Sequence, residues 1–186
     1  GIEVPDIITH TNTVGHSHVL HPKWRDTNFS KQILRRLILK AGSRLRRKNF
    51  FCKKLSISIK STCGIKIVGK KKFNKINDSF SLLEKTDILW TKLITPYKKI
   101  KIKHISIVLY ELEVVNSSQM NFLKYLKNDI EKSFNKKNSL SNVIDIINSR
   151  FGRDSITIGS LPNQISHFSG TKVAFTRIPD IKEFYE

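Results

Sequence analysis

The sequence predicts an α+β fold with the element order β-α-β-β-α-β: a four-stranded sheet with two helices on one face, followed by a small, mostly helical C-terminal extension. Three observations predict it. Two stretches repeat apolar residues every three or four positions, which is typical of amphipathic helices. Other stretches alternate apolar and polar residues, as half-buried strands do. Hydrophobic residues make up 39% of the 186 residues, enough for a single core.

The first predicted elements are a strand over residues 14–20 and a helix that Asp26 or Asn28 can cap. In the strand, the even positions Val14, His16 and His18 are expected on one side and the odd positions on the other. The helix has an apolar stripe and a basic outer face. The stripe consists of Phe29, Ile33, Leu34, Leu37, Ile38, Ala41 and Leu45, and the basic face of Lys31, Arg35, Arg36, Lys40, Arg44 and Arg47.

A hairpin and a second helix complete the predicted order. Residues 52–60 alternate cleanly, residues 61–64 form a turn, and the alternation resumes at Ile65 and Ile67. Asp78 caps the second helix and Pro96 stops it. A last strand is expected over residues 100–114.

Changes in composition and hydrophobic periodicity along the chain predict four segments: a linker at 1–11, a domain at 12–115, a second linker at 116–125 and an extension at 126–186. Within the last part, residues 122–134 read as a short helix. Residues 135–142 are predicted to break it, and residues 140–152 to form another helix with Gly152 as its C-cap.

Charge points to a polyanionic partner. The formal net charge is +19, and residues 27–77 hold 16 lysines and arginines with no aspartate or glutamate. A single-sign field of this size favours nucleic acid as the partner. The sequence shows no membrane span and no signal peptide, and Cys52 and Cys63 are the only cysteines, so we expect a cytoplasmic, nucleoid-associated protein.

One sheet face is predicted to stay open and to suit phosphate contacts. Its expected outward residues are Lys54, Ser56, Ser58, Lys60, Lys66, Lys103, His104 and Ser106. This set includes no aromatic side chain, which favours the backbone of a duplex over the stacked bases of a single strand.

The sequence offers little for catalysis. Four of its six histidines lie in residues 10–24, but only Asp26 is near enough to supply a third strong metal ligand, so we expect packed or solvated histidines and no metal. No nucleophile, phosphate-loop or dinucleotide motif is found. The carboxylates are scattered, and Glu111 and Glu113 fall at a strand end, where we expect them to be solvated.

Three stretches resemble a known family. Residues 12–20, NTVGHSHVL, resemble the opening strand of the little finger domain of Y-family translesion DNA polymerases. Residues 38–60 are similar to that domain's first helix and second strand. Residues 143–159, VIDIINSRFGRDSITIG, are similar to the stretch beyond the little finger in bacterial members related to DNA polymerase IV and the polymerase V catalytic subunit. The resemblance spans roughly residues 12–160.

The resemblance implies a module that grips duplex primer-template DNA through phosphates in DNA repair and the SOS response, without chemistry of its own. The fragment is then not an enzyme and needs no cofactor. The catalytic carboxylates and their Mg²⁺ would belong to a palm domain of the parent polymerase, a nucleotidyltransferase. The implied DNA-binding residues are Thr13, Gly15, His16, Lys54, Ser56, Ser58, Lys60, Lys66, Lys103 and His104. Asn12 departs from the family's usual basic residue, and His104 from its usual second cation.

The resemblance also implies contact with the bacterial sliding clamp. Gln119, Met120, Phe122 and Leu123 lie in a five-residue stretch similar to the family's clamp peptide, although only the glutamine is identical. The alternative is a helix start with Phe122 packed inward. For the chain as a whole, the alternatives are a basic RNA-associated, ribosome-bound protein, which duplex DNA against duplex RNA competition would separate, and a metalloenzyme built on the histidine run.

Overall fold

The computed structural model describes residues 12–97, 99–114, 128–152 and 154–159; for residues 128–135 it describes the backbone only. Strand β1 (Val14–Val19) leads through a short 3-10 helix, η1 (Pro22–Trp24), into helix α1 (Thr27–Arg47). Strands β2 (Phe50–Ser61) and β3 (Lys66–Ile76) form a hairpin, and helix α2 (Ser79–Ile94) follows. Strands β4 (Ile102–Tyr110) and β5 (Glu113–Val114) precede the long helix α3 (Asn128–Phe151).

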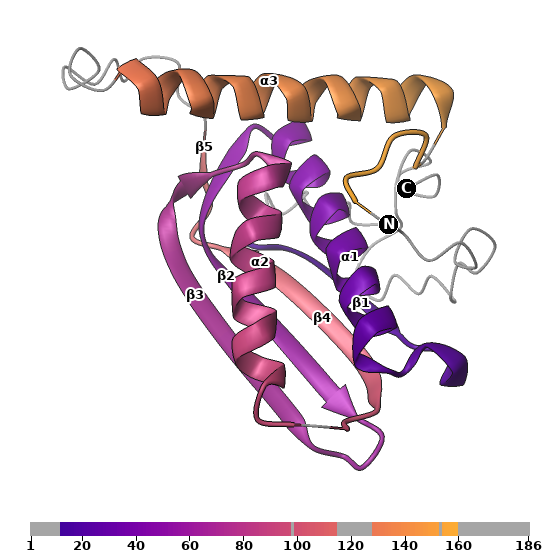
Figure 1. Ribbon diagram of the computed structural model, residues 1–186. Coiled ribbons are helices and arrows are strands. Elements are labelled where there is room, and N and C mark those ends of the chain that lie inside the picture. Colours follow the sequence, from indigo (N-terminus) through magenta and orange to yellow (C-terminus); the bar gives the residue numbers. More distant parts are fainter. Residues whose placement is uncertain (1–11, 98, 115–127, 153, 160–186) are drawn as a thin grey trace, which may run out of the picture.

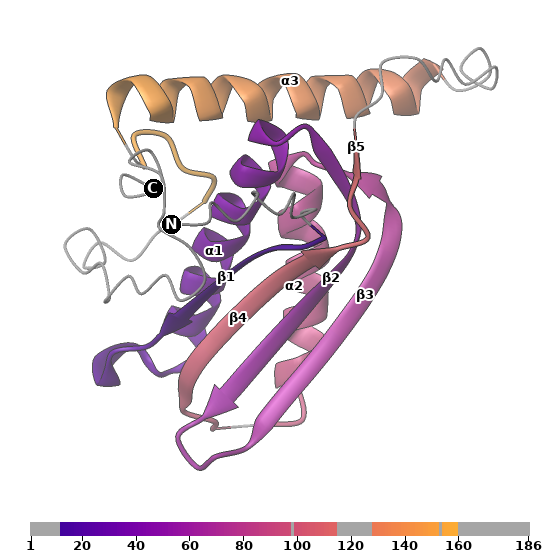
Figure 2. The ribbon, with the colours of Figure 1, turned by 180° about the vertical axis from the view of Figure 1, so that it is seen from behind.

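The sheet is antiparallel in the order β1-β4-β2-β3, and β5 pairs with the start of β2. Helices α1 and α2 cover one face of it (Figure 1), and the view from behind shows the other face without a helix (Figure 2). The predicted β-α-β-β-α-β order and the two-layer α+β architecture are therefore confirmed.

The predicted helix starts are confirmed in detail. The Asp26 side chain accepts a hydrogen bond from the Phe29 backbone N–H at 2.8 Å, and Asp78 accepts one from Ser81 N–H at 2.8 Å. Each carboxylate satisfies a backbone donor that the first helical turn leaves without a partner.

The core lies between the helices and the sheet. Its central layer is the alternating apolar set of β2 and β4, whose members are all fully buried: Leu55, Ile57, Ile59, Ile105, Ile107 and Leu109. From α1, Leu34, Ile38 and Ala41 close over this layer. Gly69 of β3 leaves room for α2, since a Cβ there would lie 2.8 Å from a methyl group of Leu93.

The last predicted strand is interrupted. Residues 100–114 do not form one strand, because Glu111 adopts a left-handed φ of 52°. That conformation turns the chain out of the pleat for two residues before β5 resumes pairing with Phe50 and Phe51.

The break predicted at residues 135–142 is wrong, since α3 runs through it without interruption. A buried polar contact explains the continuity. The Ser141 hydroxyl donates to the Lys137 carbonyl and accepts from the Ser79 backbone N–H at 3.0 Å, at the start of α2. Tertiary packing thus outweighs the modest helix propensity of the asparagines and serines in this segment. Helix α3 lies across the ends of α1 and α2 (Figure 1).

Candidate nucleic-acid interface

The uncovered face of the sheet, hereafter the open face, consists of the residues that alternate with the core. Strand register places them in rows across the strands, because each Cα has a defined partner on the next strand. The open face comprises Gly15, Ser17, Val19, Lys54, Ser56, Ser58, Lys60, Lys66, Val68, Lys70, Lys72, His104, Ser106, Val108 and Tyr110, with Lys103 beside them.

Short side chains occupy the middle of the open face. One row runs Ser17–Ser106–Ser58–Val68, and the next runs Gly15–Val108–Ser56–Lys70. Short side chains and hydroxyl groups therefore occupy the centre, where a phosphate backbone could approach the sheet closely and receive hydrogen bonds.

Lysines occupy both ends of the open face. At the hairpin end, Lys60 pairs with Lys66 on one side and with His104 on the other; at the far end, Lys54 pairs with Lys72. Like charges directly opposite each other on adjacent strands destabilise a sheet. Such a local cost is typical of a surface whose charge serves an anionic ligand.

A β-bulge adds a further cation at the hairpin end. Lys60 is paired with His104 but Ser61 with Ile102, so Lys103 is an extra residue on β4. The bulge lets Lys103 be exposed between buried Ile102 and half-buried His104. It is the reason why two consecutive residues, Lys103 and His104, can both border the open face as predicted.

Ion pairing differs between the two sides of the molecule. On the helix side, Arg35 pairs with Asp87, Arg36 with Asp154, and Arg46 with Asp145. At the far end of the open face, Glu111 lies 3.5 Å from Lys54 and 3.9 Å from Lys72.

Four lysines of the open face and its bulge make no ion pair with any carboxylate in the described part of the chain: Lys60, Lys66, Lys70 and Lys103. Three arginines of the helix side, Arg35, Arg36 and Arg46, are paired with carboxylates, whereas these four lysines give the open face near the hairpin a positive charge that no described carboxylate compensates.

His104 adds a titratable group to this end. Its pKa is lowered, chiefly by burial and then by the nearby Lys60 ammonium group. His104 is therefore mostly neutral at pH 7, where it can donate or accept a hydrogen bond, and becomes a cation in acid.

Two sequence-based expectations about faces need correction. His16 pairs with the core residue Ile107, so it points to the helix side, away from the open face. Residues two positions apart in a strand share a side, so His16 lies on the same side as buried Val14. The family resemblance had grouped His16 with the DNA-binding residues. The second correction is Tyr110, which pairs with Lys54 and places an aromatic ring at the end of a face predicted to have none.

Other predicted residues lie where expected. Gly15 lies on the open face, where a Cβ would come 2.8 Å from the Ile107 carbonyl oxygen, and Thr13 is exposed just before β1. Lys70 and Lys72 were missed, although they lie four and six residues after Lys66 and so continue the same alternation. Glu113 is not merely solvated but pairs with Lys53 and Lys75.

The remaining candidates have no site in the described residues. Those residues contain no group of three His, Cys, Asp or Glu side chains that could hold a metal ion. His18 lies beside Arg36 and Lys40 of α1, and its pKa is lowered by burial and then by these two cations. The clamp candidates Gln119, Met120, Phe122 and Leu123 lie outside the described residues. Across the described ranges, no helix combines the length and apolarity that a membrane crossing requires.

The chain matches the family model for the impB/mucB/samB family C-terminal domain over residues 11–122. It is similar to a Dbh-Dpo4 Y-family DNA polymerase chimera, with 16% identity and a TM-score of 0.49, over 57% of this chain and 30% of that one. It is also similar to DinB from Sulfolobus solfataricus, with 16% identity and a TM-score of 0.47, over 56% of this chain and 29% of that one. A third similar structure is a complex of the β-clamp processivity factor and the little finger domain of PolIV, with 11% identity and a TM-score of 0.43, over 59% of this chain and 97% of that one. No curated protein sequence matches significantly.

The fold and the open face define a basic, two-layer α+β module with one uncovered sheet face. The family model covers more than half of the chain, so the chain belongs to the impB/mucB/samB family through that family's C-terminal domain, as the resemblance predicted. It spans about 30% of the length of the polymerase structures named first.

Proposed function

We propose that this chain is the duplex DNA-binding module of a translesion DNA polymerase, and that its open face grips primer-template DNA through phosphates. The observation that carries the proposal is the uncompensated lysine cluster at the hairpin end, formed by Lys60, Lys66 and Lys103 beside a low, hydroxyl-rich centre. Lysine ammonium groups and serine hydroxyls are ordinary phosphate ligands. Membership of the impB/mucB/samB family supports the assignment.

The direct test is fluorescence anisotropy with a labelled 20-base-pair primer-template DNA. The triple variant Lys60→Gln, Lys66→Gln, Lys103→Gln should weaken binding about 30-fold or more, because three phosphate contacts are lost. A matched control, Lys23→Gln, Lys92→Gln, Lys99→Gln, removes the same charge from exposed residues outside the open face and should change affinity by a few-fold at most. Equal losses in the two variants would reject the open face as the interface.

A competition experiment distinguishes the DNA-binding proposal from the RNA-binding alternative. A duplex RNA of the same sequence, at the same salt concentration, should displace the DNA poorly. If RNA displaces it at a much lower concentration, the RNA-associated alternative replaces the DNA-binding proposal.

We further propose that the catalytic carboxylates and their Mg²⁺ belong to another part of the parent polymerase. The purified chain should then extend no primer with Mg²⁺ or Mn²⁺. Residues 119–123 are proposed to bind a sliding clamp, on the strength of their sequence alone. A cytoplasmic, nucleoid-associated role in SOS damage tolerance follows from these proposals.

A further inference from the structure

The corner that follows β4 brings a carboxylate to the far end of the open face. Leu109 is buried on the helix side, and residues two apart in a strand share a side, so Glu111 would also face the helices if β4 continued. Its φ of 52° turns the chain instead, and its carboxylate oxygens lie 3.5 Å from the Lys54 ammonium group and 3.9 Å from that of Lys72. The corner lies at the end of the sheet opposite the turn between β2 and β3 (Figure 2).

The backbone conformation of Glu111 is unusual for its residue type. A positive φ crowds the Cβ atom against the backbone, and glycine adopts it far more readily. Residues held in such strained conformations gather at functional sites. The conformation is therefore a reason to ask what the Glu111 carboxylate does on the open face.

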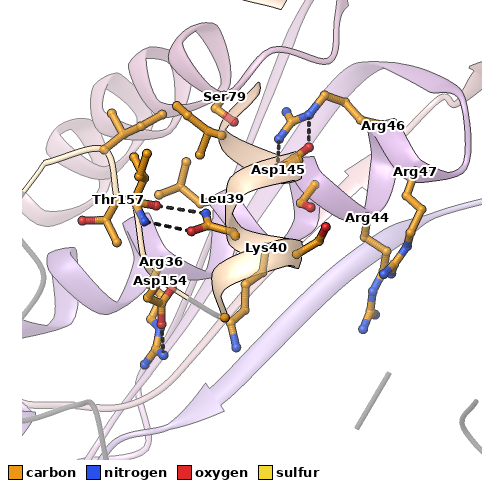
Figure 3. Close-up of a pocket in the computed structure, with 17 residues that line it drawn as sticks. Arg36, Leu39, Lys40, Arg44, Arg46, Arg47, Ser79, Asp145, Asp154 and Thr157 are labelled. Carbon is orange, nitrogen blue, oxygen red and sulfur yellow. Dashed lines mark hydrogen bonds and ion pairs between the residues drawn. The ribbon is translucent and has the colours of Figure 1, made fainter. Parts of the chain in front are cut away.

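The ion pairs of Glu111 do not join separate parts of the chain. On the helix side, Asp145 of α3 pairs with Arg46 of α1, and Asp154 pairs with Arg36, so these carboxylates attach distant segments to each other (Figure 3). Glu111 directly follows β4, which backbone hydrogen bonds already join to β2, and β2 is joined in the same way to β3. The fold therefore does not depend on Glu111 to hold these strands together.

Relief of repulsion between lysines does not explain Glu111 either. Lys54 and Lys72 lie opposite each other on β2 and β3, and Glu111 contacts both. At the hairpin end, Lys60 and Lys66 lie opposite each other in the same way but make no ion pair with any carboxylate in the described part of the chain. Because these strands pair there without a compensating carboxylate, the fold tolerates such a lysine pair.

Glu111 is also held more loosely than the next glutamate. Glu113 in β5 accepts hydrogen bonds from Lys53 and Lys75, and these bonds keep the pKa of its carboxyl below the usual value. The distances from Glu111 to its lysines exceed the roughly 2.7–2.9 Å of a hydrogen-bonded ion pair. The Lys72 side chain is 74% exposed, so a phosphate can reach it from solvent and replace the carboxylate.

We propose that Glu111 is an internal competitor of DNA phosphates on the open face. Its carboxylate occupies Lys54 and Lys72 and thereby confines the strong phosphate contacts to the hairpin end. The proposal rests on the DNA-binding function proposed above. A phosphate at the far end has to displace the carboxylate from both lysines, so the module binds DNA more weakly, and with a smaller dependence on salt, than its lysines would allow.

The test measures anisotropy with the full chain and the 20-base-pair primer-template DNA, between 50 and 300 mM KCl. Glu111→Gln should strengthen binding about fivefold to tenfold at 100 mM KCl. It should also steepen the slope of log K against log salt concentration by about 1 to 2, because each further phosphate contact adds about −0.9. Glu84→Gln removes the same charge from an exposed residue of α2, on the helix side, and should change affinity less than about twofold.

A double-mutant cycle tests whether the effect passes through the two lysines. The pair of substitutions Lys54→Gln, Lys72→Gln should reduce affinity at least about five times more in the Glu111→Gln protein than in the wild type, because only there are both lysines released for phosphate. Equal losses in the two backgrounds would overturn the proposal, since Glu111 would then act only through the overall charge.

Glu111→Gly provides a second variant without the carboxylate, and glycine fits the φ of 52°. It should show the same gain in affinity as Glu111→Gln, and circular dichroism melting reports whether each variant keeps its fold. Weaker DNA binding by both folded variants would overturn the proposal, because the carboxylate would then support the interface.

The variant Lys60→Gln, Lys66→Gln, Lys103→Gln separates failure of this proposal from failure of the proposed function. If that variant loses affinity while Glu111→Gln gains none, the open face is still the interface and Glu111 is not a competitor. If neither variant changes affinity, both proposals are wrong.

Discussion

At the scale of single residues, the two faces of β2 divide stability from binding. Ile57 is fully buried between the sheet and the helices, while its neighbour Ser58 is on the open face. Strand pleating puts these consecutive residues on opposite sides, so substitutions one position apart act on different properties of the protein.

Ile57→Ala should therefore destabilise the fold by about 2–5 kcal/mol, through lost apolar burial and the cavity left behind. Ser58→Ala should change the free energy of unfolding little. Urea denaturation of both variants measures the difference. If Ile57→Ala left the unfolding midpoint in place while Ser58→Ala lowered it, the strand would be shifted by one residue.

His104 predicts a pH dependence of DNA binding. Its pKa is lowered by burial and by Lys60, so protonation as the pH falls below the ordinary histidine value of about 6.5 adds charge to the open face. Binding should strengthen in acid more for the wild type than for His104→Gln. His18→Gln, on the helix side, should keep the wild-type response, and an identical response in His104→Gln would exclude His104 as the titrating group.

Acid has the opposite effect on the stability of the fold: it strengthens DNA binding through His104 but lowers the free energy of unfolding. A histidine whose pKa is lower in the folded state binds more protons when unfolded. Both His104 and His18 have lowered pKa values, so stability is greatest above the unfolded pKa and declines as the pH falls below about 6.5. The DNA titrations therefore need to remain at a pH where the fold is intact.

At the scale of elements, α3 is attached to α1 by the ion pair between Arg46 and Asp145. The Arg46 side chain is 6% exposed and also donates to the Asn77 carbonyl at 2.7 Å, so it ties α3 to the loop before α2 as well. The pair forms two hydrogen bonds of 2.7 and 2.9 Å, an arrangement that favours arginine over lysine.

Arg46→Leu should destabilise the protein by roughly 2–4 kcal/mol. Loss of one member of a fully buried pair costs about 3–5 kcal/mol, and Asp145, at 25% exposed, retains some hydration. The double variant Arg46→Leu, Asp145→Leu should recover part of this loss, because no lone carboxylate remains. Thermal denaturation of these two variants and of the single variant Asp145→Leu completes the cycle, and strict additivity would show that the pair is not coupled.

Residues 119–123 give a prediction for the segment before α3. If they bind a sliding clamp as proposed, a Phe122→Ala, Leu123→Ala double variant should lose about 3 kcal/mol or more of apolar contact and with it measurable clamp binding. DNA affinity and melting temperature should stay at wild-type values. A variant that lost its fold instead would show that these side chains belong to the core.

At the scale of the whole molecule, the distribution of charge governs how binding responds to salt. The formal net charge is +19, and on the helix side Asp87, Asp154 and Asp145 pair with Arg35, Arg36 and Arg46. On the open face and its bulge, Lys60, Lys66, Lys70 and Lys103 pair with no carboxylate in the described part of the chain and are left to meet phosphates. Binding through them should be largely independent of sequence, since phosphates carry no sequence information.

Five phosphate contacts would give a slope of log K against log salt concentration near about −4.5. Anisotropy titrations between 50 and 300 mM KCl, with two unrelated duplex sequences, measure it. The expected result is the same steep slope for both. A flat response, or strong preference for one sequence, would argue against a phosphate-gripping face.

The local pattern of the sequence predicted the two layers, both helix caps and the faces of β2 and β4, because alternation and capping depend on neighbours only a few residues apart. It also contained the signal for Lys70 and Lys72. It also placed His16 on the same side as Val14, but only the pairing with Ile107 showed that this side faces the helices.

Contacts between distant parts of the chain decided the rest. Arg46 and Asp145 are 99 residues apart, and Ser141 and Ser79 are 62 apart, so only packing could reveal which cations are neutralised and why α3 continues through a polar stretch. The bulge at Lys103 likewise depends on how β4 aligns with β2. A sequence sets the charge and the period of each segment, while the tertiary structure brings separated segments together and thereby determines which charges are left for a ligand.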